Sequence, residues 1–309
     1  MTMPREIQRR IRDIQSDNQS GSLDLTKKAA STIQWFAQIS AHSTPSRFRH
    51  NLIRTSKALL HAQPAMAGIV NLVDAVVSAA DEADKKDLTL TVGKTARDFA
   101  KRLDQSSKTI ARKATALIKS GSTVVTHSFS STVFRAMLLA RTRGKRFNVI
   151  CTESRPMCEG VALARKLGRS GIPAKLVIDA AVFSFLPEAS CVMVGADAIS
   201  LRGVVNKAGT YGIAVAAKAR GIPFFALCGA QKLLPESIRV TRDVLMDPAE
   251  ILGRRVRLTR AARAVNIYFD STPLSYVTKF VTEEGVISAF RLRHLLKSIR
   301  MSKLFRARP

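Results

Sequence analysis

Several polar and charged residues follow short apolar runs in the second half of the chain, where a binding site could form. Asp197 comes directly after the apolar run 191–195, and Asn206 and Lys207 follow a few residues later. Lys232 comes shortly after the next apolar run. A carboxylate beside an amide and two ammonium groups can move a proton and hold a phosphate. The spacing therefore predicts an acid or base, Asp197, next to a phosphate site.

Two other loops offer groups that bind anions. The segment 126–132, which includes Ser128, is rich in serine and threonine and leads into an apolar helical pattern, so its hydroxyls and backbone N–H groups suit a phosphate. Arg155 follows the second apolar run and could clamp an oxyanion with its guanidinium. Ordinary helix capping in 126–132 and an ion pair between Glu153 and Arg155 explain the same residues without a ligand. Asp179 could equally bond a ligand hydroxyl or cap a helix.

The runs that precede these residues predict a parallel sheet. Most are continuously apolar and β-branched, which is typical of strands buried on both faces and covered by helices. Ligands bind such sheets beyond the carboxyl ends of the strands, where the polar residues lie. The expected strands are 122–126, 147–151, 175–179, 191–195, 223–228 and 265–269.

The first part of the chain predicts helices instead. Apolar residues recur at helical spacing, and glycine, serine and proline interrupt the pattern. The expected helices are 5–14, 23–41, 46–62 and 88–119. We therefore expect an α/β protein: a helical domain over 1–120 and, over 121–309, a Rossmann-like parallel sheet with helices on both faces that binds phosphate and mediates oligomerisation.

Composition excludes several classes of protein. The longest early apolar stretch, 65–80, is interrupted by Asp74, so no membrane span is expected, and the N-terminus lacks the apolar core of a secretory signal. The four cysteines have no metal-ligand spacing and are interpreted as reduced thiols of a cytoplasmic protein. Neither a metal nor a cofactor is expected.

The positive charge is unusually high. Fifty Lys and Arg against 23 Asp and Glu give a net charge of +27, which attracts RNA, ribosomes, acidic proteins or phosphorylated metabolites. Basic residues concentrate at 141–146, at 254–263 and in the tail from Arg291, but they also occur along the whole chain. A basic surface that reflects only the composition of the host's proteins explains the charge equally well.

Six motifs occur in a familiar order. They are THSFSSTV, TESRPMCEG, VIDAAV, VGADAI, VNKAGTYGIA and KLLP. Their order and spacing resemble the translation initiation factor 2B alpha/beta/delta family, whose superfamily includes ribose-1,5-bisphosphate and methylthioribose-1-phosphate isomerases. The resemblance covers about residues 120–290 strongly and the helical half weakly, mainly through 20–22 and 51–54.

The resemblance implies roles for individual residues. The isomerases carry a catalytic cysteine directly after the Thr-His of the first motif and an aspartate in the Gly-Ala-Asp motif, and these positions are Ser128 and Asp197 here. A serine hydroxyl has a far higher pKa than a cysteine thiol, whose pKa is about 8.5. Serine is therefore a poor replacement for the cysteine as a group that exchanges protons. The phosphate contacts of the isomerases correspond to Arg54, Asn206, Lys207 and Lys232, and their substrate loop to Gly21 and Ser22, without the loop's arginine.

Three functions follow. The first is a non-catalytic factor 2B-like subunit that binds a sugar phosphate or nucleotide between the two halves and forms homodimers or larger oligomers, with initiation-factor subunits as partners. The second is an aldose-ketose sugar-phosphate isomerase. The third is an RNA- or ribosome-binding protein. The segment 270–285, which is similar to the last motif of the family, is expected to contribute to an isologous dimer contact, with Leu274, Val277, Phe280, Val281 and Val286 mostly buried.

Overall fold

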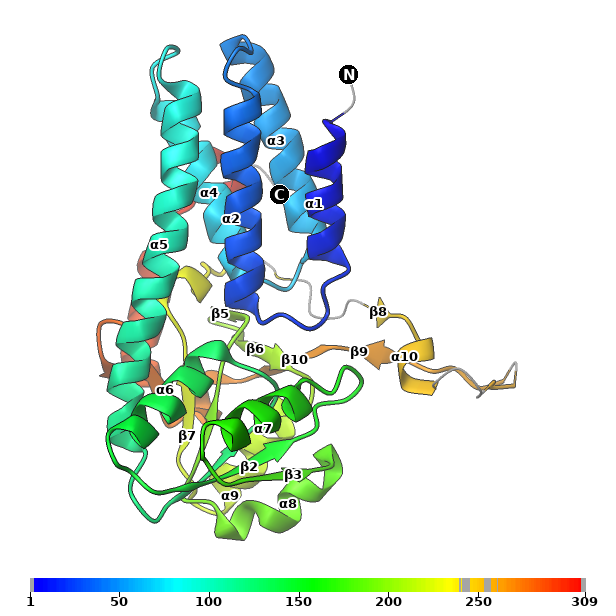
Figure 1. The fold of residues 1–309 in the computed structure, drawn as a ribbon, viewed down its shortest axis with the longest axis vertical. Helices are drawn as coiled ribbons and strands as arrows, with labels where there is room; N and C mark the ends of the chain where they lie inside the picture. The colour runs from blue at the N-terminus through cyan, green and yellow to red at the C-terminus, as the bar shows by residue number, and fades with distance from the viewer. Residues whose placement is uncertain (1–2, 239, 241–244, 253–256, 260, 307–309) are drawn as a thin grey trace.

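Five helices form the first part of the molecule and stand on an α/β layer in the computed structural model (Figure 1). The structure describes residues 3–238, 240, 245–252, 257–259 and 261–306. Each helix buries one side in a shared core; α1, for example, buries Ile7, Ile11 and Ile14, which are spaced by one helical turn. The helices are α1 (Arg5–Gln15), α2 (Ser22–Ile39), α3 (Pro45–Ala62), α4 (Ala67–Glu82) and α5 (Leu88–Ala114), and a 3₁₀ turn, Thr115–Leu117, follows α5.

The α/β layer is built on a seven-stranded sheet with the order β12-β11-β7-β4-β1-β2-β3. All neighbouring strands are parallel except β11 and β12, which are antiparallel. The strands are β1 (Thr123–Thr126), β2 (Asn148–Thr152), β3 (Ala174–Val177), β4 (Cys191–Val194), β7 (Phe224–Leu227), β11 (Lys279–Val281) and β12 (Val286–Ile287). The α/β fold with a mostly parallel sheet, predicted from the apolar runs, is confirmed.

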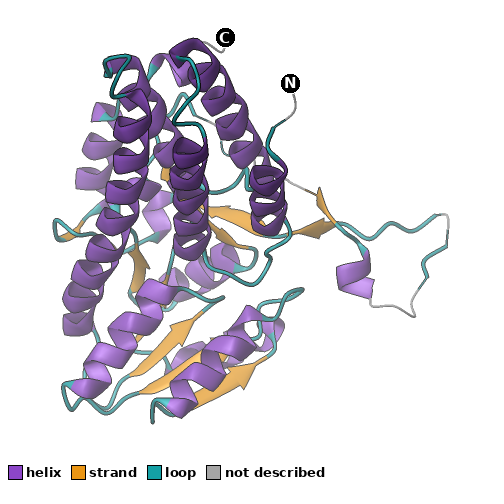
Figure 2. Cartoon of the chain, turned by 45° about the horizontal axis from the view of Figure 1, so that its top comes forward, coloured by secondary structure: helices purple, strands orange, loops and turns teal. Residues whose placement is uncertain are grey.

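Helices cover both faces of this sheet (Figure 2). Successive strand residues enter different cores, as expected for side chains that alternate across a strand: Val124 packs with α5, α6 and α7, and Val125 packs with α8, α9 and α11. The helices of this layer are α6 (Ser131–Thr142), α7 (Glu159–Arg169), α8 (Val182–Phe185), α9 (Thr210–Ala219) and α11 (Ala289–Ser298), with 3₁₀ turns at Asp179–Ala181, Leu186–Glu188, Ala230–Lys232 and Leu274–Tyr276.

A second sheet lies between the helices and the large sheet. It has three antiparallel strands in the order β10-β6-β5: β5 (Ala198–Ser200), β6 (Gly203–Lys207) and β10 (Phe269–Thr272). Lys207 is the last residue of β6. The small sheet thereby carries Lys207 toward the carboxyl ends of the large sheet.

The prediction that 265–269 forms a strand of the parallel sheet is wrong. Asn266–Ile267 (β9) pairs with Leu245–Met246 (β8) in a two-stranded sheet, from which an arm containing α10 (Ala249–Leu252) projects, and Phe269 begins β10 (Figure 1). Ile267 is 43% exposed, so the segment lacks the double burial that a central parallel strand requires. The strand β11 takes the expected place beside β7. Part of the basic cluster 254–263 lies outside the described residues.

The end of the chain returns to the helical half. The backbone N–H of Ser302 donates a hydrogen bond of 2.7 Å to Asp74, and α12 (Lys303–Arg306) follows. Leu304 and Phe305 pack against the helical core. No helix within the described residues combines the length and the apolar character that crossing a membrane requires.

Candidate functional site

A cavity lies where the helical half meets the carboxyl ends of β1 and β4, and its volume is about 60 Å³. The loop between α1 and α2 forms one side, and the segment that precedes α6 forms another. Its lining includes seven of the residues singled out in the sequence: Gly21, Ser22, Ser128, Asp197, Asn206, Lys207 and Lys232.

Arg54 and Arg155 are not among the described residues that line this cavity. Arg54 lies on α3. Arg155 is exposed, and its guanidinium donates a hydrogen bond of 3.1 Å to the backbone carbonyl of Ile251 in the arm. The structure therefore brings together seven of the nine predicted residues, and the two arginines are not among the described residues that line the cavity.

Asp197 lies in the short connection between β4 and β5. Its backbone N–H donates to Val205, and its carbonyl accepts from Ala67 at the start of α4, so the position of its backbone is set by both halves. Burial raises the pKa of the Asp197 carboxyl, and the charges of Lys232 and Lys207 oppose this shift only in part. A carboxyl with a raised pKa can hold a proton that an exposed aspartate would have lost.

Lys232 reaches the same place from the turn after β7. Its ammonium donates a hydrogen bond to the carbonyl of Ala196, next to Asp197. Burial lowers the pKa of Lys232, and the charge of Asp197 acts in the opposite direction. The two groups thus stabilise each other's ionised forms inside the cavity.

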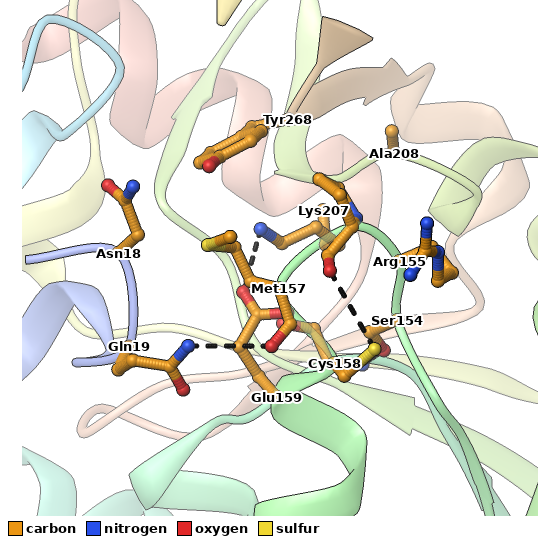
Figure 3. A network of polar contacts seen from close by, with 12 residues as sticks. Asn18, Gln19, Ser154, Arg155, Met157, Cys158, Glu159, Lys207, Ala208 and Tyr268 are labelled. Atoms are coloured by element: carbon orange, nitrogen blue, oxygen red, sulfur yellow. Dashed lines mark hydrogen bonds and ion pairs between the residues drawn. The ribbon is translucent and has the colours of Figure 1, made fainter. Parts of the chain in front are cut away.

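Lys207 is held by a residue that sequence reasoning missed. Its Nζ lies 2.7 Å from Oε1 of Glu159 and 4.5 Å from the centre of the Tyr268 ring, and Figure 3 shows the lysine directed at the carboxylate. The side chains of Lys207 and Glu159 are only 6% and 9% exposed. The other oxygen of Glu159, Oε2, is buried without a hydrogen-bond partner among the described residues.

Close packing fixes Glu159 at the first position of α7. A Cβ atom on the neighbouring Gly160 would lie 1.7 Å from the carbonyl oxygen of Thr152, so only glycine lets the helix start against the end of β2. The signal for Glu159 was present in the motif TESRPMCEG, where a carboxylate precedes this glycine. Its partner could not be read there, because Lys207 lies 48 residues further along the chain.

Ser128 occupies a left-handed backbone conformation, with a φ of 65°, at the edge of the cavity. Its backbone N–H donates a hydrogen bond of 2.7 Å to the hydroxyl of Ser154. Non-glycine residues adopt this conformation rarely and at some energetic cost, so the loop after β1 is held in place by its surroundings.

Buried hydrogen bonds continue from Ser154 beneath the cavity. The Ser154 hydroxyl lies 3.1 Å from that of Thr152, which lies 2.6 Å from Nδ1 of His127. Burial lowers the pKa of His127, and its Nε2 lies 2.8 Å from the carbonyl of Ala208. Since a carbonyl only accepts, a neutral ring carries its hydrogen on Nε2 and accepts from Thr152 at Nδ1. The network joins the loops after β1, β2 and β6.

Asp179 anchors the second of these loops. Its carboxylate accepts hydrogen bonds of 2.7 Å from the backbone N–H groups of both Ser154 and Arg155. The sequence left a ligand hydroxyl and a helix cap open for this residue, and in the structure it binds the neighbouring loop.

Asp17 organises the loop between α1 and α2. Burial acts to raise its pKa, but hydrogen bonds from the Lys28 ammonium and from Ser20 outweigh this and lower the pKa to about 2. Two long hydrogen bonds link the loop to the sheet half: one of 3.4 Å from Gln19 to the carbonyl of Met157 (Figure 3) and one of 3.5 Å from Asn18 to Glu250.

The cavity is therefore close to balanced in charge. Among its described lining residues, the cations Lys207 and Lys232 face the carboxyl groups of Asp17, Glu159 and Asp197. When Asp197 is protonated, two positive and two negative charges remain. No group of three His, Cys, Asp or Glu within the described residues is placed to hold a metal ion.

None of the described residues that line the cavity is a cysteine. Cys151, Cys191 and Cys228 are buried, and burial raises their pKa values to about 12, 11 and 12. Their thiols are therefore poorly suited to ionise near neutral pH.

Comparison with known proteins identifies related sequences and structures. The model of the initiation factor 2 subunit family, IF-2B, matches residues 18–289. The crystal structure of the Pyrococcus horikoshii translation initiation factor eIF-2B is similar, with 31% identity, a TM-score of 0.80, and coverage of 92% of this chain and 98% of that chain. The ribose 1,5-bisphosphate isomerase of Archaeoglobus fulgidus is 31% identical over 292 residues, covering 91% of this chain and 90% of the isomerase.

A third similarity concerns the fold alone. A chain of the tetrameric eIF2B-beta2-delta2 complex from C. thermophilum has 22% identity and a TM-score of 0.72, covering 94% of this chain and 93% of that chain. Similar proteins thus include both a factor and an isomerase, so similarity by itself leaves the choice between these functions to the chemistry of the cavity.

Proposed function

Because this chain belongs to the initiation factor 2 subunit family, we propose that it is a non-catalytic, factor 2B-like subunit that binds a sugar phosphate or nucleotide in the cavity. The observation that carries this proposal is Ser128, which lines the same cavity as Asp197 and stands where the related isomerases have a cysteine. Cytoplasmic location is part of the same proposal.

Chemistry supports the non-catalytic role. An aldose-ketose isomerisation moves protons between neighbouring carbon and oxygen atoms, which needs groups that exchange protons near neutral pH. Asp197, with its raised pKa, is one such group. The Ser128 hydroxyl has too high a pKa to act as the second, and no described cysteine lines the cavity.

The cavity nevertheless offers groups for a phosphate. Lys232 and Lys207 supply positive charge, and the segment 128–132 supplies hydroxyls at the start of α6. Ser130 caps this helix by accepting a hydrogen bond of 3.3 Å from the N–H of Val133. At about 60 Å³ the cavity has room for a few water molecules. A sugar phosphate needs more room than this, so the proposal includes an outward movement of the loop around Asn18 and Gln19, which lines the cavity.

Isomerase activity is the second candidate. It is favoured by the raised pKa of Asp197 and by the 31% identity to the A. fulgidus isomerase. In this case Asp197 moves the proton, Lys207 and Lys232 hold phosphate, and Ser128 or a water molecule replaces the cysteine.

Assembly with other subunits belongs to the proposal. The resemblance of the fold to a chain of the tetrameric eIF2B-beta2-delta2 complex supports oligomers of this chain with itself or with other initiation-factor subunits.

A binding screen followed by an assay tests the proposal. Purified protein is screened by thermal shift against sugar phosphates, nucleotides and inorganic phosphate, and ribose 1,5-bisphosphate is then followed by ³¹P NMR. We expect a ligand to raise the melting temperature and the phosphosugar to stay unconverted. Conversion that disappears in Asp197→Asn would instead establish the isomerase, and the absence of stabilisation by any of these compounds would refute ligand binding.

A further inference from the structure

A row of cations runs along the exposed side of α5. Residues 94, 97, 101, 105, 108 and 112 are all exposed, and steps of three or four residues place them on one face of the helix. Five are basic and one is a glutamine. At 1.5 Å per residue the row is about 27 Å long. In order they are Lys94, Arg97, Lys101, Gln105, Lys108 and Arg112.

Two grooves flank this row. One lies between α2 and α5, measures about 480 Å³, and is lined by Lys27, Arg97 and Lys101 among others. The other lies between α5 and α6 and measures about 650 Å³. Gln105 and Lys108 line both, so the two grooves adjoin at these side chains. In Figure 1, α5 extends from the helical half down to the sheet layer beside α2 and α6.

The groove between α5 and α6 has an apolar floor and a basic rim. Ala111, Leu138 and Leu139 contribute apolar side chains, and Arg112 and Arg135 line its sides. Where aromatic side chains are lacking, nucleobases can stack on planar guanidinium groups and pack against apolar side chains.

Most of the row is free of acidic partners. Asp104 is the acidic residue that lines the groove between α2 and α5, and it is already bound by Lys108 at 2.6 Å, Arg135 at 3.2 Å and Lys27 at 3.3 Å. Hydrogen bonding to Lys108, followed by the other cations, keeps the pKa of Asp104 well below its usual range. Within the described residues, Lys94, Arg97, Lys101 and Arg112 have no carboxylate at ion-pair distance.

We propose that the α5 row and its two grooves bind single-stranded RNA without sequence preference. The phosphates contact the cations of the row, and the bases lie against the apolar floor between α5 and α6. A long, regular row of cations matches a repeating phosphate backbone, whereas one acidic protein helix would fill one groove and leave the rest of the row unpaired. The surface shares no lining residue with the cavity, so it does not depend on the proposed ligand.

The test measures fluorescence anisotropy of a labelled 20-nucleotide oligouridylate with the full chain over a salt series. Five contacts predict that log K falls with log salt with a slope of about −3.5. The triple variant Arg97→Glu, Lys101→Glu, Arg112→Glu is expected to bind at least tenfold more weakly and to lower the slope by about 2. These residues are chosen because none is bound to Asp104.

The control is a variant with the same change in charge elsewhere. Lys85, Lys86 and Arg220 are exposed, and replacing all three with Glu is expected to change the affinity less than threefold. Circular dichroism melting checks the fold, and single Lys101→Ala replaces the triple variant if that unfolds. Equal losses in both triple variants would overturn the proposal, and so would the absence of salt dependence. Displacement of the RNA by poly-glutamate at equal charge concentration would also overturn it and favour an acidic protein partner.

Discussion

The ammonium of Lys207 lies 2.7 Å from the carboxylate of Glu159, and both side chains are almost completely buried. The pair joins the end of β6 to the start of α7 and forms one wall of the cavity. The lysine that the sequence assigned to a phosphate therefore already has a negatively charged partner. A phosphate that binds here either shares Lys207 with Glu159 or displaces the carboxylate.

Removing one partner of this pair should strongly destabilise the protein. Glu159→Gln leaves the Lys207 charge buried without a counter-charge, so the free energy of unfolding should fall by about 3 kcal/mol. Urea denaturation measures this change. The matched control is Glu188→Gln, which breaks the exposed pair with Lys175 and should cost less than about 1 kcal/mol. Equal losses in the two variants would show that the buried pair contributes little.

The stability of the protein should depend on the protonation of Asp197. Its raised pKa means that the folded state holds this proton more tightly than the unfolded state does. The resulting stabilisation is present below the unfolded pKa, about 3.9, and is lost as the pH rises through the folded pKa. The stability of Asp197→Asn relative to the wild type should therefore increase as the pH rises from 4 to 7.5, because only the wild type loses this stabilisation.

Urea denaturation at both pH values decides this prediction. The exposed Asp84→Asn serves as control and should show no such pH-dependent gain. A relative stability of Asp197→Asn that falls over the same pH range would mean that the ionised carboxylate, paired with Lys232 and Lys207, is the favoured form.

Lys232 should contribute to phosphate binding. Lys232→Met removes an ammonium from the cavity while keeping a side chain of similar length. The affinity for whichever phosphorylated compound stabilises the wild type should fall by about tenfold or more, since hydrogen bonds to charged groups contribute about 1.5–3 kcal/mol. Isothermal titration calorimetry measures it, with the exposed Lys86→Met as control. Unchanged affinity would place the phosphate away from Lys232.

Self-association should use the exposed part of the C-terminal segment. Leu274, Val277, Phe280 and Val281 are buried in the chain's own core, as expected, so they cannot lie at the centre of a dimer contact. Val286 was also expected to be buried, but it is 43% exposed at the edge strand, and Phe290 nearby is 71% exposed. The isologous contact remains a prediction, now centred on these two side chains.

Light scattering over a salt series tests this contact. Because salt screens the repulsion between chains of charge +27, dimerisation should strengthen as salt is raised. Val286→Ser with Phe290→Ser should weaken it, and the distant exposed Leu90→Ser should leave it unchanged. A wild type that stays monomeric at every salt and micromolar concentration would refute the contact.

Much of the cavity could be predicted from the sequence because strand ends of a parallel sheet meet at one edge. The apolar runs before Ser128, Asp197 and Lys232 are continuous, so the fold class and the location of these residues followed from local pattern. The same reasoning failed at 265–269, where a short β-branched run looks like a buried strand but lies in two antiparallel sheets. Local pattern indicates a strand and does not select its partner.

The sequence by itself determined the helical first part, the parallel sheet and the group of residues around Asp197, since each depends on periodicity or on position after a strand. Tertiary structure alone decided that Glu159 binds Lys207, that Arg54 is not among the described residues lining the cavity, and that the Asp197 pKa is raised. These properties depend on distances between segments far apart in the chain and on how completely water is excluded from each group. Neither quantity is encoded in the spacing of residues along the sequence.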